Sequence, residues 1–441
     1  MTAPRLEIDL DKLHHNARTL VARLADRGIS VTGVTKAMLG SPEIADTLLR
    51  AGVSALGDSR IENIETMRGA HVPASMTLIR TPMLSQADRV VAHADLSFNT
   101  ELDIISRLSS AAQKAGKTHG ILLMVELGDL REGIMPGDLE HTVRQTLRFP
   151  NIALKGIGAN LACQSGVVPD AKNMAELSAL ADSIDATFGP RLGIVSGGNS
   201  SSLQWALSGA DTGRINDLRL GESLLLGREP LHRQPIDGLH TDAITLIGEV
   251  VESKVKPSQP WGELAQAAFG EKPPATDRGP ISRTILALGQ QDTDPSGLYP
   301  PPGIEILGAS SDHLITDSGR RCLDIGAEIT FQLNYGALLR AMTSPFVAKV
   351  TTARARPRST ARTTRGPQPT GRGPGDLIRL RTSCRASIVD TLRAVVRSAR
   401  ARSRDADHRP ASHRNRAPHR RDVCHHQIER SPERGRLRSC R

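Results

Sequence analysis

The stretch Ile29-Ser-Val-Thr-Gly-Val-Thr-Lys36-Ala-Met38, followed closely by Ser41-Pro-Glu43, sets the interpretation of the chain. β-branched residues dominate its first half, which predicts a buried strand over Val31–Thr35. The serine that follows is a good helix N-cap, the proline suits the first helical turn, and the glutamate suits the positive end of the helix dipole. Lys36 is therefore expected at the carboxyl end of a strand, just before a helix.

In an α/β barrel, the carboxyl ends of the strands carry the catalytic residues. A lysine buried at such a place has a lowered ammonium pKa, and its free amine can form a Schiff base with an aldehyde cofactor. A lysine at the end of a strand is more often an ordinary surface residue whose charge stays in water. The role of Lys36 therefore depends on what the rest of the chain places beside it.

Strand-like and helix-like segments alternate from residue 11 to residue 229. Strands are expected at eight places: Val31–Thr35, Ser54–Gly57, Met76–Arg80, Leu96–Phe98, Ile121–Glu126, Leu154–Ala159, Leu192–Val195 and Asp217–Leu220. Amphipathic helices are expected between them, because apolar residues recur there at helical spacing. Eight such units over about 200 residues favour a closed (β/α)8 TIM-type barrel of the α/β class, with an open doubly wound sheet as the alternative.

The chain changes character after residue 229. Residues 230–350 contain β-rich segments broken by Gly, Pro and Asp, with no strong helix: Ala243–Val255, Ile281–Leu288, Glu305–Leu307, His313–Thr316 and Ala327–Leu333. This pattern predicts a second, mainly β domain. The alternating N-terminal strand over residues 5–10 is a candidate member of that domain, although it lies far away in the sequence.

Positive charge is concentrated at the C-terminus. Residues 351–441 hold 24 Arg, no Lys and seven acidic residues, whereas the first 350 residues carry 33 basic and 40 acidic side chains. This tail contains no Phe, Tyr, Trp or Met, so it cannot bury enough apolar surface to order itself, and we expect it to be disordered. A segment rich in arginine but without lysine is typical of GC-rich DNA translated in a shifted reading frame, so the tail is a candidate frameshift product. The alternative is a nucleic-acid-binding arm, which would lack aromatic residues for base stacking, so nucleic acid is an unexpected partner.

Cysteine usage and hydropathy predict a cytoplasmic protein with no metal site and no membrane partner. The five cysteines form no CxxC pair or zinc spacing, and only Cys163 and Cys322 lie in the first 350 residues. No apolar run is long enough to span a membrane. The N-terminus also lacks the basic start and apolar core of a signal peptide.

Polar and glycine-rich clusters follow the later strands of the expected barrel. Gly128–Gly133 follows the fifth strand, Ser196–Ser202 the seventh, and Arg219–Gly227 covers the end of the eighth. A Gly/Ser-rich turn that enters a helix presents N–H groups and hydroxyls to a phosphate, and barrels commonly bind phosphate after strands seven and eight. A flexible loop is the alternative for such a turn alone. Together with Lys36, these clusters predict a phosphate-bearing aldehyde cofactor, for which pyridoxal 5′-phosphate (PLP) is the natural candidate.

The chain resembles the alanine racemase family of fold-type III PLP enzymes, most closely its branch of ornithine and other amino-acid racemases. The resemblance covers residues 5–350 and rests on a series of ordered motifs, none of them specific alone: Glu7-Ile-Asp-Leu-Asp11 with His15-Asn16, Val34-Thr-Lys36-Ala, Leu127-Gly-Asp-Leu-Arg131-Glu-Gly, Ser196-Gly-Gly-Asn-Ser200-Ser, Leu218-Arg-Leu-Gly-Glu-Ser-Leu-Leu-Leu-Gly227, Leu307-Gly-Ala-Ser-Ser-Asp-His313, and Phe331-Gln-Leu-Asn-Tyr-Gly336 with Met342-Thr-Ser-Pro. The resemblance implies a homodimeric racemase that removes the α-proton of an amino acid and returns it on the other face.

The resemblance also assigns roles to particular residues. Lys36 carries the cofactor and acts as one base, while Arg219 faces the pyridine nitrogen. The other cofactor-binding positions are Asn199, Ser200, Gly221 and Glu222, and the substrate-binding positions are Arg131 and Asp312. Because a guanidinium stays protonated, it does not protonate the ring nitrogen as an aspartate partner would. The ring is then a weaker electron sink, which suits racemisation better than transamination.

The chain departs from the family pattern at the second base. The segment Ala267-Ala-Phe269-Gly270 occupies the place of a tyrosine that the neighbouring subunit contributes in alanine racemases, and phenylalanine cannot transfer a proton. His313 is our candidate for that role, with a purely structural histidine as the alternative. Met124 and Asn160 stand where many alanine racemases have a carbamylated lysine and a histidine, which argues against alanine as the substrate.

Two other functions of the same fold remain as alternatives. The first is a non-catalytic PLP-binding or carrier protein, which is usually a lone barrel, so the domain at residues 230–350 argues against it. The second is a related PLP lyase of the D-threonine aldolase or D-serine dehydratase type. These lyases add a metal through a His-x-Cys pair that residues 230–350 do not contain. The amino acid itself stays open among ornithine, lysine, serine and others.

Overall fold

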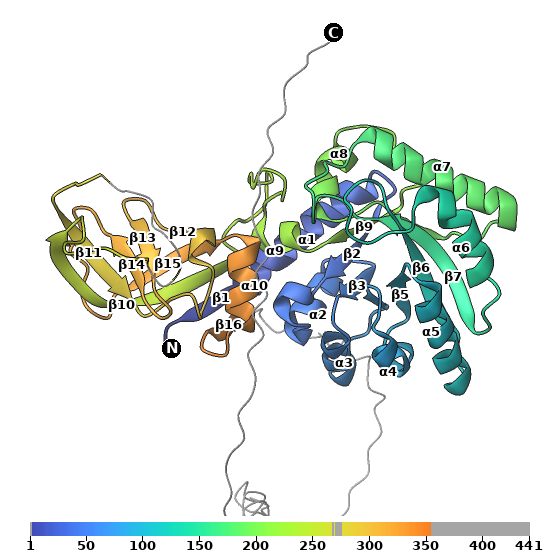
Figure 1. Ribbon diagram of the computed structural model, residues 1–441, viewed down its shortest axis with the longest axis horizontal. Helices are drawn as coiled ribbons and strands as arrows, with labels where there is room; N and C mark the ends of the chain where they lie inside the picture. Colours follow the sequence, from blue (N-terminus) through green and yellow to red (C-terminus); the bar gives the residue numbers. More distant parts are fainter. Residues whose placement is uncertain (1, 267–268, 270–275, 354–441) are drawn as a thin grey trace, which may run out of the picture. The chain divides into compact units, whose positions relative to one another are not determined.

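The computed structural model describes residues 2–266, 269 and 276–353 (Figure 1). Eight parallel strands close into a barrel in sequence order: β2 (Ser30–Val34), β3 (Ala55–Asp58), β4 (Met76–Leu78), β5 (Leu96–Asn99), β6 (His119–Val125), β7 (Ile152–Ala159), β8 (Ile194–Ser196) and β9 (Asp217–Leu220). Every strand expected for the barrel is present within a few residues of its expected bounds. The prediction of a closed barrel is confirmed, and the open sheet is wrong.

The barrel closes because its last strand, β9, pairs with its first strand, β2. Ser30 lies opposite Asp217, and Thr32 lies opposite Arg219, in parallel register. This pairing removes the open edges that a flat sheet would expose. It also places the end of β9 beside Lys36, which follows β2 in the chain.

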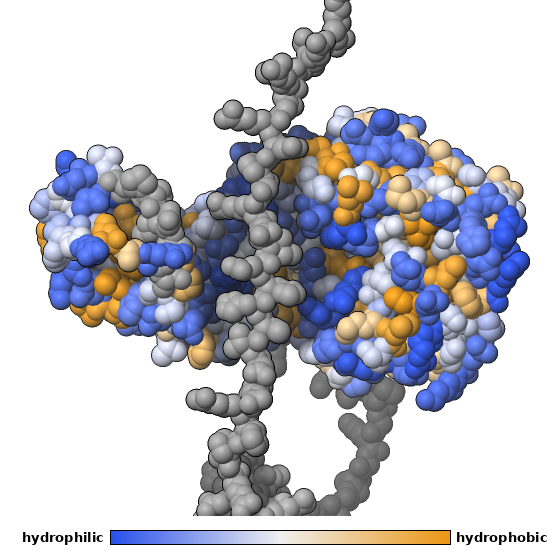
Figure 2. Space-filling model, in the orientation of Figure 1, coloured by the Kyte–Doolittle hydropathy of each residue, from blue (hydrophilic) through white to orange (hydrophobic). Residues whose placement is uncertain are grey.

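Helices lie outside the barrel strands (Figure 1): α1 (Leu10–Ala25), α2 (Pro42–Arg50), α3 (Ile61–Gly69), α4 (Ala87–His93), α5 (Leu102–Lys114), α6 (Leu139–Thr146), α7 (Ala171–Phe188), α8 (Leu203–Leu207) and α9 (Glu222–Leu226). In α1, Leu13, Leu20 and Leu24 share one fully buried face, as their helical spacing predicts. Burial of each leucine stabilises the fold by about 2 kcal/mol. On the face shown in Figure 2, hydrophilic side chains cover much of the outer surface, with smaller hydrophobic groups between them. Among the described residues, no helix is both long enough and apolar enough to cross a membrane.

The remaining strands form one sheet outside the barrel. Its main path runs in the order β12 (Leu298–Tyr299), β15 (Glu328–Leu333), β10 (Ile244–Pro257), β11 (Pro280–Leu286), β14 (Leu314–Asp317) and β13 (Glu305–Ala309). The N-terminal strand β1 (Arg5–Asp9) pairs antiparallel with β10 and parallel with β16 (Ala348–Thr352). The expected mainly β domain is therefore present, and the first strand of the chain belongs to it.

One helix of this domain differs from the expectation. The sequence indicated no strong helix after residue 230, but α10 spans Tyr335–Thr343. The side chain of Asn334 caps it by accepting a hydrogen bond from the N–H of Ala337 at 2.9 Å. An Asn-Tyr-Gly sequence is typical of a turn, and Gly336 lies in the first helical turn, so local propensity concealed the helix.

Buried Asn16 fastens α1 to the chain segment that leaves the barrel. Its Nδ2 donates to the carbonyl oxygens of His240, at 2.9 Å, and Leu224, at 3.2 Å. Its Oδ1 accepts from the N–H of His240 at 2.7 Å. The side chain is fully buried, so losing these bonds would leave unpaired polar atoms in the interior.

The last described strand shows where a shortened protein can end. β16 continues to Thr352, two residues beyond the expected boundary, and pairs with all five residues of β1. Most of the tail predicted to be disordered, residues 354–441, lies outside the described residues.

We expect a fragment of residues 1–353 to fold like the full chain, since every strand partner of β1 is kept. A fragment of residues 1–346 removes β16 and should melt at a lower temperature by circular dichroism. If the 1–353 fragment were insoluble while the full chain folded, residues 354–441 would be structural.

His119, the first residue of β6, is a buried histidine whose neutral form the fold favours. Its exposed fraction is 2%, and its Nε2 lies 2.8 Å from Ser97 Oγ. Burial lowers the pKa of His119 from 6.5 to about 4, and the charge of Asp95 opposes this shift. The unfolded chain therefore takes up a proton below pH 6.5, whereas the folded chain does so only near pH 4. The free energy of unfolding should fall as the pH drops between these values.

We expect His119→Gln to remove this part of the acid sensitivity, which amounts to at most about 3 kcal/mol. His141→Gln, on the exposed side of α6, is the matched control and should leave the sensitivity unchanged. Urea unfolding of the three proteins at pH 7 and pH 4.5 measures the difference. The same pH dependence in wild type and His119→Gln would contradict the assignment.

Candidate active site

A cavity of approximately 350 Å³ opens at the carboxyl ends of the barrel strands. Seven of the residues predicted from the sequence line it: Lys36, Arg131, Asn199, Ser200, Arg219, Gly221 and Glu222. Tyr335, at the start of α10, lines it from the β domain. The cavity has the size of a site for a small ligand.

Lys36 lies directly after β2, at the start of the short 3-10 helix η1 (Lys36–Met38). The next turn needs a glycine, because Gly40 has a φ of 66° and a Cβ there would lie 2.6 Å from the backbone oxygen of Asn63. The ammonium nitrogen of Lys36 is 5.9 Å from the centroid of the Tyr335 ring. The half-buried lysine therefore points into the cavity that both domains line.

Asp58, at the end of β3, holds the backbone beside this lysine. Its Oδ2 accepts from Thr35 Oγ1 at 2.8 Å, and its Oδ1 accepts from Asn63 Nδ2 at 3.0 Å and from the N–H of Arg60 at 2.9 Å. Burial raises the pKa of the Asp58 carboxyl, and these hydrogen bonds oppose the shift. The sequence analysis missed Asp58, because only the barrel brings it against the residue before Lys36.

Arg219 is almost fully buried at the base of the cavity. Its Nη2 donates to the carbonyl oxygen of Ala159 at 2.8 Å and to Asn160 Oδ1 at 3.1 Å. Its guanidinium carbon lies 5.0 Å from the centroid of the Phe98 ring, a cation–π arrangement. Burial lowers the pKa of Arg219, and the charge of Asp217 opposes the shift. The Arg219 guanidinium therefore contacts both the Phe98 ring and the Asn160 amide in the wall of the cavity.

Ser200 and the start of α9 form a second polar group of the cavity. Ser200 Oγ accepts from the N–H groups of Gly221 and Ser223, both at 3.3 Å, and lies 3.0 Å from Ser223 Oγ. A Cβ on Gly221 would come within 3.2 Å of Val34 Cβ, so a larger residue would crowd this point. Two N–H groups and two hydroxyls converge here, which suits an anion with several oxygens.

Glu222 places a carboxylate beside this anion-binding group. It forms an ion pair with Arg233, which also lines the cavity. Burial raises the pKa of the Glu222 carboxyl, and the charge of Arg233 opposes the shift. The ion pair offsets the repulsion that a free carboxylate would exert on an anion.

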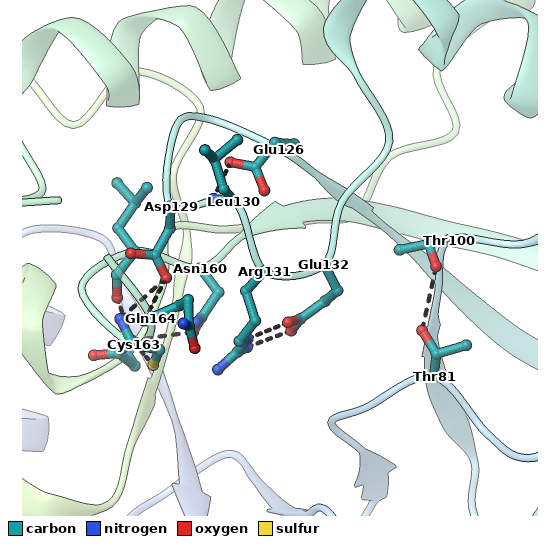
Figure 3. A network of polar contacts seen from close by, with 12 residues as sticks. Thr81, Thr100, Glu126, Asp129, Leu130, Arg131, Glu132, Asn160, Cys163 and Gln164 are labelled. Carbon is teal, nitrogen blue, oxygen red and sulfur yellow. Dashed lines mark hydrogen bonds and ion pairs between the residues drawn. The ribbon is translucent and has the colours of Figure 1, made fainter. Parts of the chain in front are cut away.

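Asp129 joins the loops that follow β6 and β7 (Figure 3). Its carboxylate accepts hydrogen bonds from the three consecutive N–H groups of residues 163–165, at 2.9 to 3.1 Å. In the same loop, Arg131 pairs with Glu132, and both line the cavity. Cys163 Sγ, held by the Asp129 contacts, accepts from Asn199 Nδ2 at 3.3 Å. The sequence analysis singled out Arg131 but not Asp129 or Cys163, whose contacts cross between loops.

Two buried polar atoms of the cavity walls have no hydrogen-bond partner among the described residues: Tyr335 Oη and Asn160 Nδ2. Such atoms are costly unless a ligand or water satisfies them. Burial raises the pKa of Tyr335, so its hydroxyl keeps its proton and can donate it in a hydrogen bond. PLP fits this donor set, because the cavity offers an amine, a buried guanidinium, an anion-binding group and two unsatisfied donors.

Asp312 and His313 lie apart from the residues that line this cavity in one chain. Both belong to the turn between β13 and β14, where His313 Nδ1 is 3.3 Å from Asp312 Oδ1 and both side chains are exposed. Phe269 is exposed as well, and residues on both sides of it lie outside the described residues. Among the described residues, no group of three or more His, Cys, Asp or Glu side chains is arranged to hold a metal ion.

Known proteins match the chain over both of its domains. The family model for the alanine racemase N-terminal domain matches residues 8–229. The ornithine racemase of Acetoanaerobium sticklandii is 42% identical over 351 residues, which is 78% of this chain and 99% of that protein. The lysine racemase of Thermotoga maritima is 37% identical over 354 residues, or 79% of this chain and 99% of that protein.

Solved structures share the fold at lower sequence identity. The alanine racemase from Streptomyces lavendulae aligns with a TM-score of 0.63 at 18% identity and covers 80% of this chain and 98% of that one. The D-threonine aldolase from Filomicrobium marinum aligns with a TM-score of 0.61 at 16% identity and covers 77% of this chain and 88% of that one. With the family model and both racemases matched across the barrel and its cavity, the chain belongs to the alanine racemase family.

Proposed function

We propose that the protein is a PLP-dependent amino-acid racemase in which Lys36 carries the cofactor. One observation supports this most strongly: Lys36, buried Arg219 and the anion-binding group at Ser200 line a single cavity. The ornithine and lysine racemases that resemble the chain along almost their full length support the same reaction. A non-catalytic PLP carrier and a PLP lyase remain the alternatives that experiments must exclude.

In this proposal two polar groups of the cavity, the anion-binding group and Arg219, have partners on the cofactor. Ser200 and the N–H groups of Gly221 and Ser223 bind the phosphate, and the Tyr335 hydroxyl is a further donor at the cavity wall. Arg219 faces the pyridine nitrogen. When bound, PLP supplies an aldehyde that accepts the amino group and a ring that spreads negative charge from the α-carbon.

Arg219 determines how strongly that ring withdraws electrons. Its guanidinium keeps its proton, so it donates a hydrogen bond to the ring nitrogen without protonating it. Charge at the α-carbon is then less delocalised, and that carbon regains a proton quickly. This favours return of the proton over transfer of the amino group, as racemisation requires.

Racemisation needs a proton donor and acceptor on each face of the α-carbon. The amine of Lys36, at the end of β2, serves one face, and Arg131 of the same cavity binds the substrate. Asp312, which lies outside this cavity, binds the substrate from a second subunit in this proposal. We propose that the other face is served by His313 of a second subunit in a homodimer, since His313 lies outside the cavity of its own chain.

The substrate is an amino acid, and ornithine and lysine are the first to test, because two relatives bear those names. Incubation with each of the nineteen chiral standard L-amino acids and with L-ornithine, followed by circular dichroism, identifies the substrate by loss of optical activity. Release of a keto acid or an aldehyde in place of the D-amino acid would favour the lyase alternative. PLP binding without any exchange of the α-hydrogen would favour the carrier.

We expect Lys36 to be the residue that holds PLP covalently. The purified protein should show a near-visible absorption band that borohydride removes, and peptide mapping should then find a pyridoxyl group on Lys36. Lys36→Ala should lose the band and all turnover, whereas Lys254→Ala, an exposed lysine of β10, should change neither. A pyridoxyl group on another lysine would overturn the assignment.

His313→Asn tests the second base through exchange of the α-hydrogen with deuterium from solvent. Because two enantiomers have equal free energy, net racemisation must weaken in both directions. Exchange should be kept for the enantiomer whose α-hydrogen faces Lys36 and should fall roughly 100-fold or more for the other. His141→Asn is the matched control. Equal and small losses for both enantiomers would return His313 to a structural role and direct attention to Tyr335.

A further inference from the structure

Asp217, the first residue of β9, is a buried carboxylate that the proposed reaction does not use. Its exposed fraction is 8%, and it lies directly opposite Ser196 in the register of β8 and β9. Thr32 Oγ1 donates to Asp217 Oδ1 at 2.7 Å, and Ser196 Oγ donates to Asp217 Oδ2. Arg219 Nη1 donates to the same Ser196 oxygen at 2.6 Å. The carboxylate thus reaches the guanidinium through one hydroxyl.

The chemistry of the three side chains fixes the direction of each hydrogen bond that links Asp217, Ser196 and Arg219. An ionised carboxylate can only accept, and a guanidinium can only donate. The hydroxyl of Ser196 has a single proton, and it donates that proton in a hydrogen bond to the carboxylate of Asp217. The Ser196 oxygen must therefore present its lone pairs to Arg219, so Asp217 makes this serine an acceptor.

The opposite charges of Asp217 and Arg219 also stabilise each other. Arg219 has an exposed fraction of 4%, so little water surrounds its charge. Burial raises the pKa of the Asp217 carboxyl and lowers the pKa of Arg219, and their mutual attraction opposes both shifts. Each group therefore helps to keep the other ionised in the interior.

Arg219 also borders open space on its far side. A second cavity of approximately 170 Å³ lies inside the barrel, and its lining mixes serines and threonines with apolar side chains and includes Asp217, Phe98 and Arg219. Phe98 and Arg219 line both cavities and so separate them. Packing does not close the space behind the guanidinium, so its position depends on the Phe98 ring and on its hydrogen bonds. The bond to Ser196 is the one that Asp217 controls.

We propose that Asp217 is a positioning residue, which through Ser196 holds the guanidinium of Arg219 against the ring nitrogen of the cofactor. The inference rests on the proposed function, since it takes PLP to be the ligand that Arg219 faces. Asp217 touches neither cofactor nor substrate. Its effect passes through the hydroxyl of Ser196, which shares the register of β8 and β9 with it.

Three variants test this role. Ser196→Ala removes the linking hydroxyl and keeps both charges, and Asp217→Asn removes the carboxylate charge. Thr32→Val removes the other hydrogen bond of Asp217 but leaves the path through Ser196 intact, so it is the matched control for any loss of stability. The holoenzymes carry PLP labelled with 15N in the ring, and their solid-state spectra report the hydrogen bond at that nitrogen directly.

In Ser196→Ala and Asp217→Asn, the ring-nitrogen resonance should move downfield, toward that of free unprotonated pyridine, because the hydrogen bond from Arg219 weakens. Their kcat should fall at least roughly tenfold, as expected for loss of a charged hydrogen bond, with little change in KM. Thr32→Val should keep the wild-type resonance and kcat even if its melting temperature falls. If Asp217→Asn does not fold, Ser196→Ala decides alone.

A wild-type resonance in Ser196→Ala and in every folded Asp217 variant would overturn the positioning role while leaving the racemase proposal intact. The same shift in Thr32→Val would overturn it too, since general loosening of the core would then be the cause. A wild-type protein that binds no PLP would overturn both proposals. A wild type that binds PLP but racemises nothing would overturn the proposed function alone, because the resonance still reports whether Asp217 positions Arg219.

Discussion

Closure of the barrel between β2 and β9 is the constraint on which the site depends. The two strands are nearly 200 residues apart in sequence, yet their register places Thr32 opposite Arg219. Lys36 follows β2, and the anion-binding group combines Ser200, which follows β8, with the start of α9, which follows β9. Backbone hydrogen bonds between the strands therefore set the separation of these groups in space. A site built in this way holds its groups within the small tolerances that catalysis demands.

The same closure places charged groups where little water reaches them. Three charged groups are buried beside or beneath the cavity: Asp58, Asp217 and Arg219. Burial raises the pKa of both carboxyl groups and lowers the pKa of the guanidinium, which favours the neutral form of each. Isolated charges would be expelled from such a place or neutralised. Hydrogen bonds from Thr35, Asn63, Ser196 and Thr32 provide the compensation. Buried charges of this kind gather at functional sites, because a fixed charge in a dry environment acts strongly on a ligand.

The sequence predicted those parts of the molecule whose signals are local. Short stretches of about ten residues are enough to recognise the strand that ends at Lys36. The same is true of the glycine- and serine-rich runs around Ser200 and Gly221. The barrel follows from eight repeats of such patterns. The β domain could also be predicted, because its segments are β-rich and are interrupted by Gly, Pro and Asp. The alternating strand β1 was a candidate member of it, and the structure places it there.

The parts that sequence reasoning missed depend on contacts between distant segments. Asp58 accepts a hydrogen bond from the residue before Lys36, which lies 23 positions away in the sequence, and Asp129 accepts from residues 163–165 in another loop. Neither carboxylate differs locally from an ordinary surface aspartate. Helix α10 was missed for another reason. Its Asn-Tyr-Gly start predicts a turn, and the helix is stabilised by the Asn334 cap and by packing of Ala337, Leu338 and Ala341 into the interior.

Helix α10 also bears on which function the fold can support. It begins at Tyr335, whose ring lies 5.9 Å from the amine of Lys36, so the β domain forms one wall of the cavity. A lone barrel would leave this wall open to solvent and would lose the buried Tyr335 hydroxyl, which has no hydrogen-bond partner in the described parts of the chain. A closed wall excludes water from the amine and strengthens every electrostatic interaction inside the cavity. Storage or transport of a cofactor requires no such wall, whereas controlled removal and return of a proton at one carbon atom does.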